Sequence, residues 1–245
     1  MLAVEPTEDA MRSHAHDPQS IRRRLESGPK TSYLRDFVYG GIDGAVTTFA
    51  LVAGVFGAGL STRTLLILGS ANLLADGFSM AASNYLGTRA EHEEYARAEA
   101  FERAQIRNNP DGERQEVRQI LGRKGFTGDA LEQAISTYTD DESRWITFML
   151  QEEYGLTPHL RAAPKAGLAT FAAFFVCGAA ALVPYATGLS RPFVGATVAT
   201  GVVFFGIGSL KSRFTSRPWW KQGLETLSIG GAAAALAYGV GVLLG

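Results

Sequence analysis

The chain has 245 residues but only one cysteine, Cys177, and its formal net charge is −1. A single cysteine excludes an internal disulfide framework and a zinc site made of cysteines. The near-neutral charge argues against nucleic acid as a partner, because proteins that bind nucleic acid present an excess of Lys and Arg. No nucleophile–base pair and no phosphate-binding loop can be recognised, so an enzyme is the least favoured functional class.

Charge is also sparse in five long segments. The composition, 46% hydrophobic and 19% charged, resembles that of a soluble protein, but the two kinds of residue are segregated along the chain. The charge-poor segments cover 37–60, 65–86, 166–187, 193–210 and 226–245, whereas charge is concentrated in 1–36 and 87–161. A helix that crosses a bilayer needs about 20 apolar residues, and these segments meet or approach that length.

We therefore predict an all-α integral membrane protein with five transmembrane helices and a cytosolic helical domain inserted between the second and third. The predicted parts are an N-terminal tail with a basic interfacial helix (1–36), the first two membrane helices (37–86), the insert (87–164) and the last three membrane helices (165–245). Residues 1–20 are expected to be disordered, and the interfacial helix is expected over 21–36. No apolar signal segment precedes the first span, so that span itself is expected to direct the chain to the membrane.

The distribution of positive charge predicts the orientation. Lys and Arg gather in the N-terminal segment and in the connection between the fourth and fifth spans (Arg22, Arg23, Arg24, Lys30 and Arg35; Lys211, Arg213, Arg217 and Lys221). The other two short connections contain only Arg63 and Arg191. The positive-inside rule places the N-terminus and the insert in the cytosol and the C-terminus outside. The Arg- and Ala-rich composition favours a bacterial inner membrane, with a vacuolar or other organellar membrane as the alternative.

The insert is predicted to be helical throughout. The second span continues without a breaker from Tyr85 to Asn108, and the helix is expected to stop near Asn109-Pro110, because proline disfavours helix at the preceding residue. Further helices are expected over about 111–123, 128–139 and 141–154. Asp140 or Asp141 would cap the last of these.

Two carboxylates lie inside the first two spans, where a charge costs roughly 2.5–3.5 kcal/mol on insertion scales and therefore usually marks a functional site. In the second span, polar residues and one methionine recur every four residues (Asn72, Asp76, Met80 and Asn84). A similar stripe runs along the first span (Asp36, Gly40, Asp43 and Thr47). Each stripe shares one helical face, and together they could line a hydrophilic path.

The ligand types in this path indicate which ions could pass. Carboxylate oxygens bind divalent cations generally, while the Met80 sulfur adds a soft ligand that favours a first-row transition metal over Mg²⁺ or Ca²⁺. The alternatives are that Met80 is an ordinary packing residue and that Asp43 makes a hydrogen bond between helices.

A second set of candidate ligands lies in the insert. Its acidic residues form pairs that share a helical face, and a methionine lies four residues before the last of them (Glu99 and Glu102; Glu113 and Glu116; Glu152 and Glu153; Met149). These side chains could form a cage for several divalent ions. The alternative is an ordinary solvated surface, in which neighbouring arginines pair with the glutamates.

The runs YGGIDGAVTTFALVAGV (39–55) and LADGFSMAASNYLG (74–87) resemble the paired signature of the vacuolar iron transporter family, and the acidic insert is similar too. The resemblance covers about residues 32–245. It implies a homodimer with the ion path at the subunit interface, a cytosolic metal-binding domain, and export of Fe²⁺, and often Mn²⁺, in exchange for protons. Asp43 and Met80 match the family's pore residues, and the insert ligands match Glu102, Glu113, Glu116, Glu153 and Met149.

The sequence departs from the family pattern at two places. A family G-E-[YF] run after S-M-A reads Ser83-Asn84-Tyr85 here, and Asp76 on the same stripe is a candidate for the missing carboxylate. The first insert helix of the family often reads E-x-x-E, whereas Glu102 is followed three residues later by Gln105. Both departures concern the choice and number of ions rather than the fold.

The resulting expectation is export of Fe²⁺ from the cytosol by proton antiport, with no cofactor other than the transported and bound ion. Oxygen and thioether ligands also accept Mn²⁺, Co²⁺ and Zn²⁺, so the sequence leaves the metal open. The alternative is a membrane-anchored sensor or buffer of divalent metal that does not transport. It would need the insert acids but not Asp43.

Overall fold

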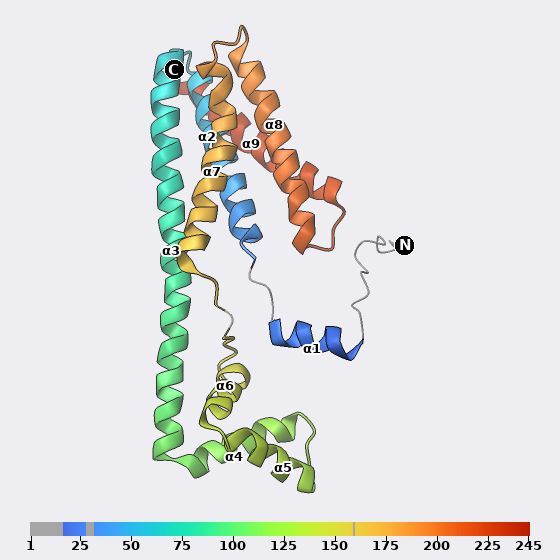
Figure 1. Cartoon of the computed structure of the whole chain (residues 1–245). Coiled ribbons are helices and arrows are strands. Elements are labelled where there is room, and N and C mark those ends of the chain that lie inside the picture. The colour runs from blue at the N-terminus through green and yellow to red at the C-terminus, as the bar shows by residue number, and fades with distance from the viewer. Residues whose placement is uncertain (1–16, 28–31, 159) are drawn as a thin grey trace. The chain divides into compact units, whose positions relative to one another are not determined.

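The structure is a computed structural model that describes residues 17–27, 32–158 and 160–245 (Figure 1). All regular elements within these ranges are helices. The chain divides into two units at residue 31, so the N-terminal unit is described by itself. Most of the tail that was expected to be disordered lies outside the described residues.

The N-terminal unit contains one described helix, α1 (Pro18–Ser27). The Asp17 carboxylate accepts a hydrogen bond from the Ser20 backbone N–H at 2.9 Å, as an N-terminal cap does. The prediction of one basic helix over 21–36 is therefore wrong in its bounds. Ser32 and Tyr33 are not helical, and residues 34–36 form the first turn of the next helix.

Five helices of the second unit are long and apolar enough to cross a membrane. They are α2 (Leu34–Gly57), α3 (Thr62–Asn108), α7 (Ala163–Ala186), α8 (Pro192–Leu210), which continues as the short 3₁₀ helix η2 (Lys211–Phe214), and α9 (Trp219–Leu244). Each corresponds to one predicted span. Helix α9 starts earlier than expected, because the polar run from Trp219 onward is its first turn rather than part of the preceding connection.

Helix α3 is the longest element, and at 1.5 Å per residue its 47 residues extend about 70 Å (Figure 1). Beyond the apolar span its sequence is rich in Ala, Glu and Arg, which are strong helix formers. Exposed i,i+4 ion pairs such as Arg89–Glu93 at 2.9 Å support this part. The helix ends at Asn108 as predicted, and Asn109 caps the following helix through the Gly112 N–H.

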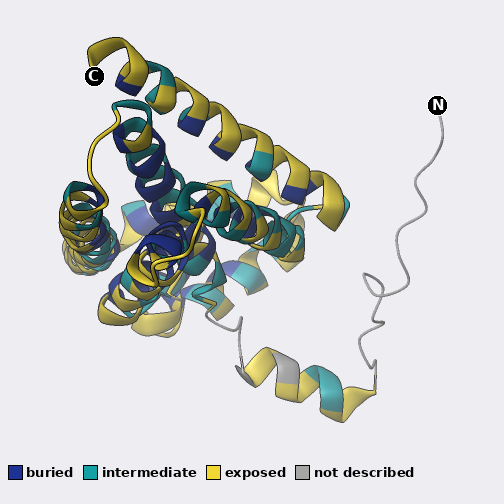
Figure 2. Ribbon diagram, turned by 90° about the horizontal axis from the view of Figure 1, so that it is seen from above, coloured by how far each residue is buried: buried dark blue, intermediate teal, exposed yellow. Residues whose placement is uncertain are grey.

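Helices α2 and α7 form the centre of the bundle, and the outward sides of the surrounding helices are exposed (Figure 2). Glycines on α2 let the two backbones approach. A Cβ atom at Gly40 would lie 2.5 Å from the Thr170 carbonyl oxygen, and one at Gly44 would meet the backbone of Phe174. Small residues serve this purpose in membrane helices. The close contact fixes the face of α2 that carries Asp43.

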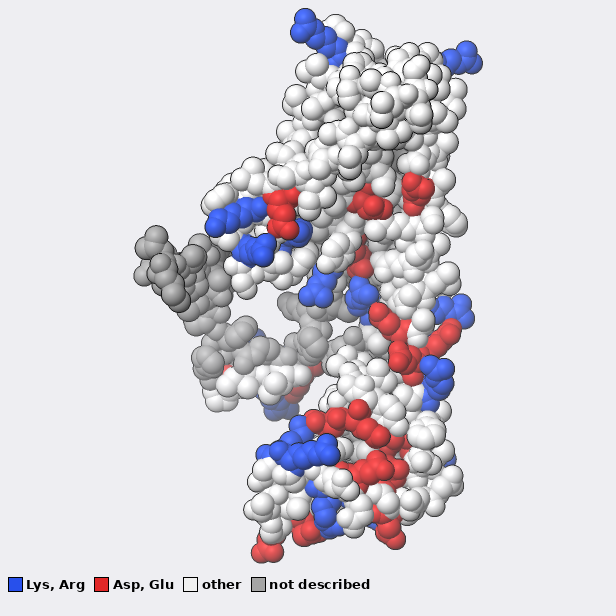
Figure 3. Space-filling view, turned by 180° about the vertical axis from the view of Figure 1, so that it is seen from behind, with Lys and Arg blue, Asp and Glu red and all other residues white. Residues whose placement is uncertain are grey.

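The segment between α3 and α7 contains three further helices, as predicted: α4 (Pro110–Arg123), α5 (Gly128–Thr139) and α6 (Glu142–Glu152). They pack with the end of α3 around their own buried core (Ile106, Val117, Leu121, Ile135, Trp145, Ile146, Phe148, Met149 and Leu150). The Asp141 carboxylate caps α6 by accepting from the Arg144 N–H at 2.7 Å. Charged side chains cover this part, whereas the far end of the bundle is almost free of them (Figure 3).

Candidate functional site

A cavity of about 690 Å³ lies among the membrane helices on the side where α2 carries its acidic residues. Helices α2, α3, α7 and α9 all contribute to its lining (Asp36, Tyr39, Ile42, Asp43, Val46, Met80, Asn84, Thr170 and Ile229). Tyr39 and Ile229 are each 57% exposed, so the cavity opens at the surface of the single chain. Most of its wall is apolar, and the polar groups are few.

Asp43, on α2, and Met80, on α3, both line this cavity. Both side chains are half-buried, and Met80 also packs against the hydrophobic core. A carboxylate and a thioether on the same cavity wall form a mixed hard and soft donor set, which suits first-row transition metals.

Of the other residues predicted to line the path, one lines the cavity and three do not. Asn84 lines the cavity, whereas Asn72, Asp76 and Thr47 do not. The Thr47 hydroxyl donates to the Asp43 backbone oxygen at 2.8 Å and so takes part in the helix itself. Asp76 is exposed on the span of α3 but lies near enough to Asp43 for their charges to interact.

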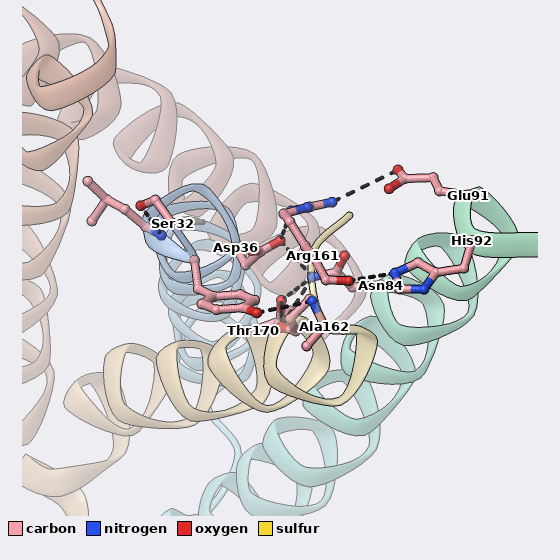
Figure 4. Close-up of polar contacts among 11 residues, drawn as sticks. Ser32, Asp36, Asn84, Glu91, His92, Arg161, Ala162 and Thr170 are labelled. Atoms are coloured by element: carbon pink, nitrogen blue, oxygen red, sulfur yellow. Dashed lines mark hydrogen bonds and ion pairs between the residues drawn. The ribbon is translucent and has the colours of Figure 1, made fainter. Parts of the chain in front are cut away.

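A polar network closes the end of the cavity nearest the insert (Figure 4). Asp36 lies in the first turn of α2, and its Oδ1 atom accepts hydrogen bonds from Arg161 Nη1 at 2.8 Å and Asn84 Nδ2 at 3.0 Å. The same Asn84 amide donates to the Thr170 hydroxyl at 2.7 Å. Asp36 is only 6% exposed, and its Oδ2 atom is buried without a hydrogen-bond partner.

The network holds the segment between α6 and α7. The Ala162 N–H donates to the Tyr33 hydroxyl at 3.1 Å, and His92 Nε2 lies 2.7 Å from the Arg161 carbonyl oxygen (Figure 4). The Arg161–Asp36 pair was missed by the sequence analysis, because its members are 125 residues apart and no periodic pattern links them.

A second site is the acidic cluster of the insert, defined here as Glu102, Glu113, Glu116 and Glu153. Glu102 is 1% exposed and Glu113 is 5% exposed, and each has one buried carboxylate oxygen without a partner. Burial, the hydrogen bond to Glu113 and the surrounding carboxylates raise the pKa of Glu102 to about 8.

The pKa values of Glu113 and Glu153 are raised too, in both cases mainly by burial. Tyr154 lies beside the cluster, and burial together with the nearby carboxylates raises its pKa to about 12. Carboxylates drawn from α3, α4 and the end of α6 thus form one electrostatically linked group. Of the four, Glu102 and Glu113 are buried, whereas Glu116 and Glu153 are exposed. Buried carboxylates usually bind a cation or keep a proton.

The remaining predicted insert residues lie differently. Glu99 pairs with Arg103 and Glu152 with Lys124, each at 2.7 Å, so both carboxylates already have a cation. Met149 is fully buried in the insert core. In the ranges that the structure describes, no group of three or more His, Cys, Asp or Glu residues has its ligand atoms gathered closely enough to hold a metal ion. The acidic cluster would therefore have to contract around an ion.

Comparison with known proteins gives a consistent result. The family model described as the VIT family matches residues 34–242. The chain therefore belongs to the VIT family. Vacuolar iron transporter 1 of Oryza sativa is 30% identical over 237 residues, which cover 94% of this chain and 90% of the relative.

Other relatives agree with this assignment. Vacuolar iron transporter 1 of Eucalyptus grandis is 30% identical and covers 84% of this chain and 84% of its own length. The vacuolar iron transporter of Toxoplasma gondii is 32% identical, with 87% of this chain and 75% of the relative covered. The VIT family is a family of transporters, so the expectation that the chain is not an enzyme is confirmed. With its five apolar helices, the chain is a multi-pass membrane protein.

Proposed function

We propose that this VIT-family protein exports Fe²⁺ from the cytosol in exchange for protons, with Mn²⁺, Co²⁺ and Zn²⁺ as further candidate substrates. The observation that carries the proposal is the cavity whose lining contains both Asp43 and Met80. A metal ion and a proton would compete for the same Asp43 oxygens. Competition for one binding site is the simplest mechanism that couples the movement of metal in one direction to that of protons in the other.

A homodimer with the path between subunits is part of this proposal. The span of α3 exposes polar side chains, Asp76, Ser79 and Ser83, on the surface of the single chain. A carboxylate facing lipid is costly, so ionisable residues in spans usually face a partner or a water-filled space. A second copy against this face would cover Asp76 and would close the cavity that is open at Tyr39 and Ile229.

The acidic cluster is proposed as the collecting site on the cytosolic side. Its four carboxylates repel one another when ionised, so a divalent cation would relieve that repulsion. The positive-inside rule supports the cytosolic placement of the insert. The relatives' names refer to vacuoles, which fits the organellar alternative for the membrane, while the bacterial inner membrane stays our prediction from composition.

A membrane-anchored metal buffer or sensor is the second candidate function, and the deep burial of Glu102 and Glu113 favours it. Such a protein would need the acidic cluster but not Asp43. Substituting each site separately distinguishes the two functions.

The test is Fe²⁺ uptake into proteoliposomes, with and without an imposed pH gradient, by the wild type and Asp43→Ala. We expect gradient-dependent uptake that is lost in Asp43→Ala, while the variant still inserts and purifies. Asp129→Ala, at an exposed site on α5, serves as the matched control and should transport normally. Full transport by Asp43→Ala would refute the proposed path. Metal binding by a wild type that does not transport would favour the buffer.

A further inference from the structure

Arg161 places a positive charge against Asp36, a residue in the wall of the cavity that is proposed to receive positive ions. Its Nη1 atom lies 2.8 Å from Asp36 Oδ1, and Asp36 is one of the residues that line the cavity. The guanidinium comes from the segment between α6 and α7, not from a membrane helix (Figure 4). A charge held in this position opposes the entry of a cation unless it moves.

Asp36 has the features of a metal ligand. It precedes Asp43 by two helical turns, about 10 Å along the same face of α2. Its Oδ2 atom is buried and has no hydrogen-bond partner, although its Oδ1 atom accepts two hydrogen bonds. A buried carboxylate oxygen without a partner is costly, because nothing replaces the water it has lost. A metal ion in the cavity would supply the missing partner.

Arg161 also lies near a second carboxylate, that of Glu91. Its Nη2 atom lies 3.9 Å from Glu91 Oε1, and the Glu91 side chain is 55% exposed. The backbone of this segment is held by the bonds from Ala162 to Tyr33 and from His92 to the Arg161 carbonyl. The guanidinium therefore lies between the buried Asp36 and the exposed Glu91, and a turn of the side chain alone would exchange one carboxylate for the other.

We propose that Asp36 is a second carboxylate of the metal path and that Arg161 is a tethered competitor that occupies it while the path is empty. An arriving divalent cation takes the Asp36 oxygens, and the guanidinium moves to Glu91. This inference rests on the proposed transport function and assigns a regulating contact to its entrance. If the Asp36 carboxylate is free of Arg161 about a tenth of the time, the apparent metal affinity is reduced about tenfold.

The test is the dependence of Fe²⁺ uptake on Fe²⁺ concentration in proteoliposomes of the full chain. Arg161→Gln removes the competitor and is expected to lower KM about tenfold, by the same population argument, without raising the maximal rate. Arg161→Lys keeps the charge but loses the two-pronged guanidinium, so it should lower KM less than Arg161→Gln does. Asp36→Asn should raise KM, and in that background Arg161→Gln should have no further effect on KM.

Glu91→Gln tests the inference at an exposed residue, where folding is not in question. It removes the carboxylate that pairs with the displaced Arg161 guanidinium. Displacement from Asp36 then becomes less favourable, so KM should rise. Glu93→Gln, on the same helix but paired with Arg89, is the matched control and should leave KM unchanged.

A KM that does not change in Arg161→Gln and Glu91→Gln, with wild-type uptake intact, would overturn this inference and leave the proposed function standing. If the Arg161–Asp36 pair serves only to stabilise the fold, KM should stay unchanged. Arg161→Gln should then only reduce the yield of folded protein. A wild type without uptake would remove both proposals.

Discussion

Glu102 shows how strongly the environment of one residue controls its chemistry. Its neighbour on the same helix, Glu99, is partly exposed and paired with Arg103, whereas Glu102 is buried against other carboxylates. Spacing alone could not separate these two glutamates, because both belong to the same i,i+3 pair. Side-chain burial, which depends on how α4 and α6 pack against α3, makes the difference.

Glu102→Gln is expected to stabilise the metal-free protein at pH 8. The pKa of Glu102 rises from its ordinary value of 4.5 to about 8 on folding, so folding favours the protonated form. Its contribution to stability is fully present below pH 4.5 and is lost as the pH rises through about 8. Thermal unfolding of the variant should show a gain on the order of 1–3 kcal/mol at pH 8 and none below pH 4.5.

The same variant should lose the stabilisation that divalent metal gives. Mn²⁺ that binds only the folded wild type raises its melting temperature by mass action. Glu132→Gln, which removes an exposed partner of Arg118, is the control and should keep the metal response. An unchanged metal response in Glu102→Gln would exclude Glu102 as a ligand.

At the scale of elements, the helices were predictable where one local signal decided them. The Asn109-Pro110 step ended α3, and Asp141 began α6, as expected. The start of α9 was not predictable, because Trp219 to Glu225 is polar enough to be interpreted as a connection, while Gln222 and Thr226 are in fact buried in the bundle. The pairing of Asp36 with Arg161 depends on tertiary contacts, so no periodic pattern in the sequence indicates it.

Helix packing gives a further prediction, at Gly44. Gly44→Ala would press a methyl group against the Phe174 backbone, which cannot yield as a flexible side chain can. We expect the free energy of unfolding to fall by a few kcal/mol, as overpacking of a tight core produces. The yield of folded protein should fall with it. Gly87→Ala is the matched control, since no atom lies within 4 Å of its added carbon. That control should be neutral or more stable by up to about 1 kcal/mol. Size-exclusion profiles and thermal melts in detergent measure the folding and stability of the two variants. Equal stability of Gly44→Ala and Gly87→Ala would contradict the close packing of α2 on α7.

At the scale of the whole molecule, the single chain leaves the Asp76 face of α3 and the cavity mouth uncovered. The proposed homodimer predicts cross-linking between copies of Ser79→Cys by a short bifunctional maleimide in a Cys177→Ser background. Val202→Cys, at an outward site on α8 that is 68% exposed, should not cross-link. Membrane samples resolved by gel electrophoresis would show the dimer. Its absence for Ser79→Cys would place any partner elsewhere.

Proton antiport requires that metal and proton move in opposite directions through the Asp43 site. The most direct measurement adds Fe²⁺ to proteoliposomes that contain a trapped pH indicator and records the internal pH during uptake. We expect the lumen to become more alkaline as Fe²⁺ enters, and we expect Asp43→Ala to abolish both the uptake and the pH change. Fe²⁺ entry without any change in internal pH would contradict the exchange of metal for protons.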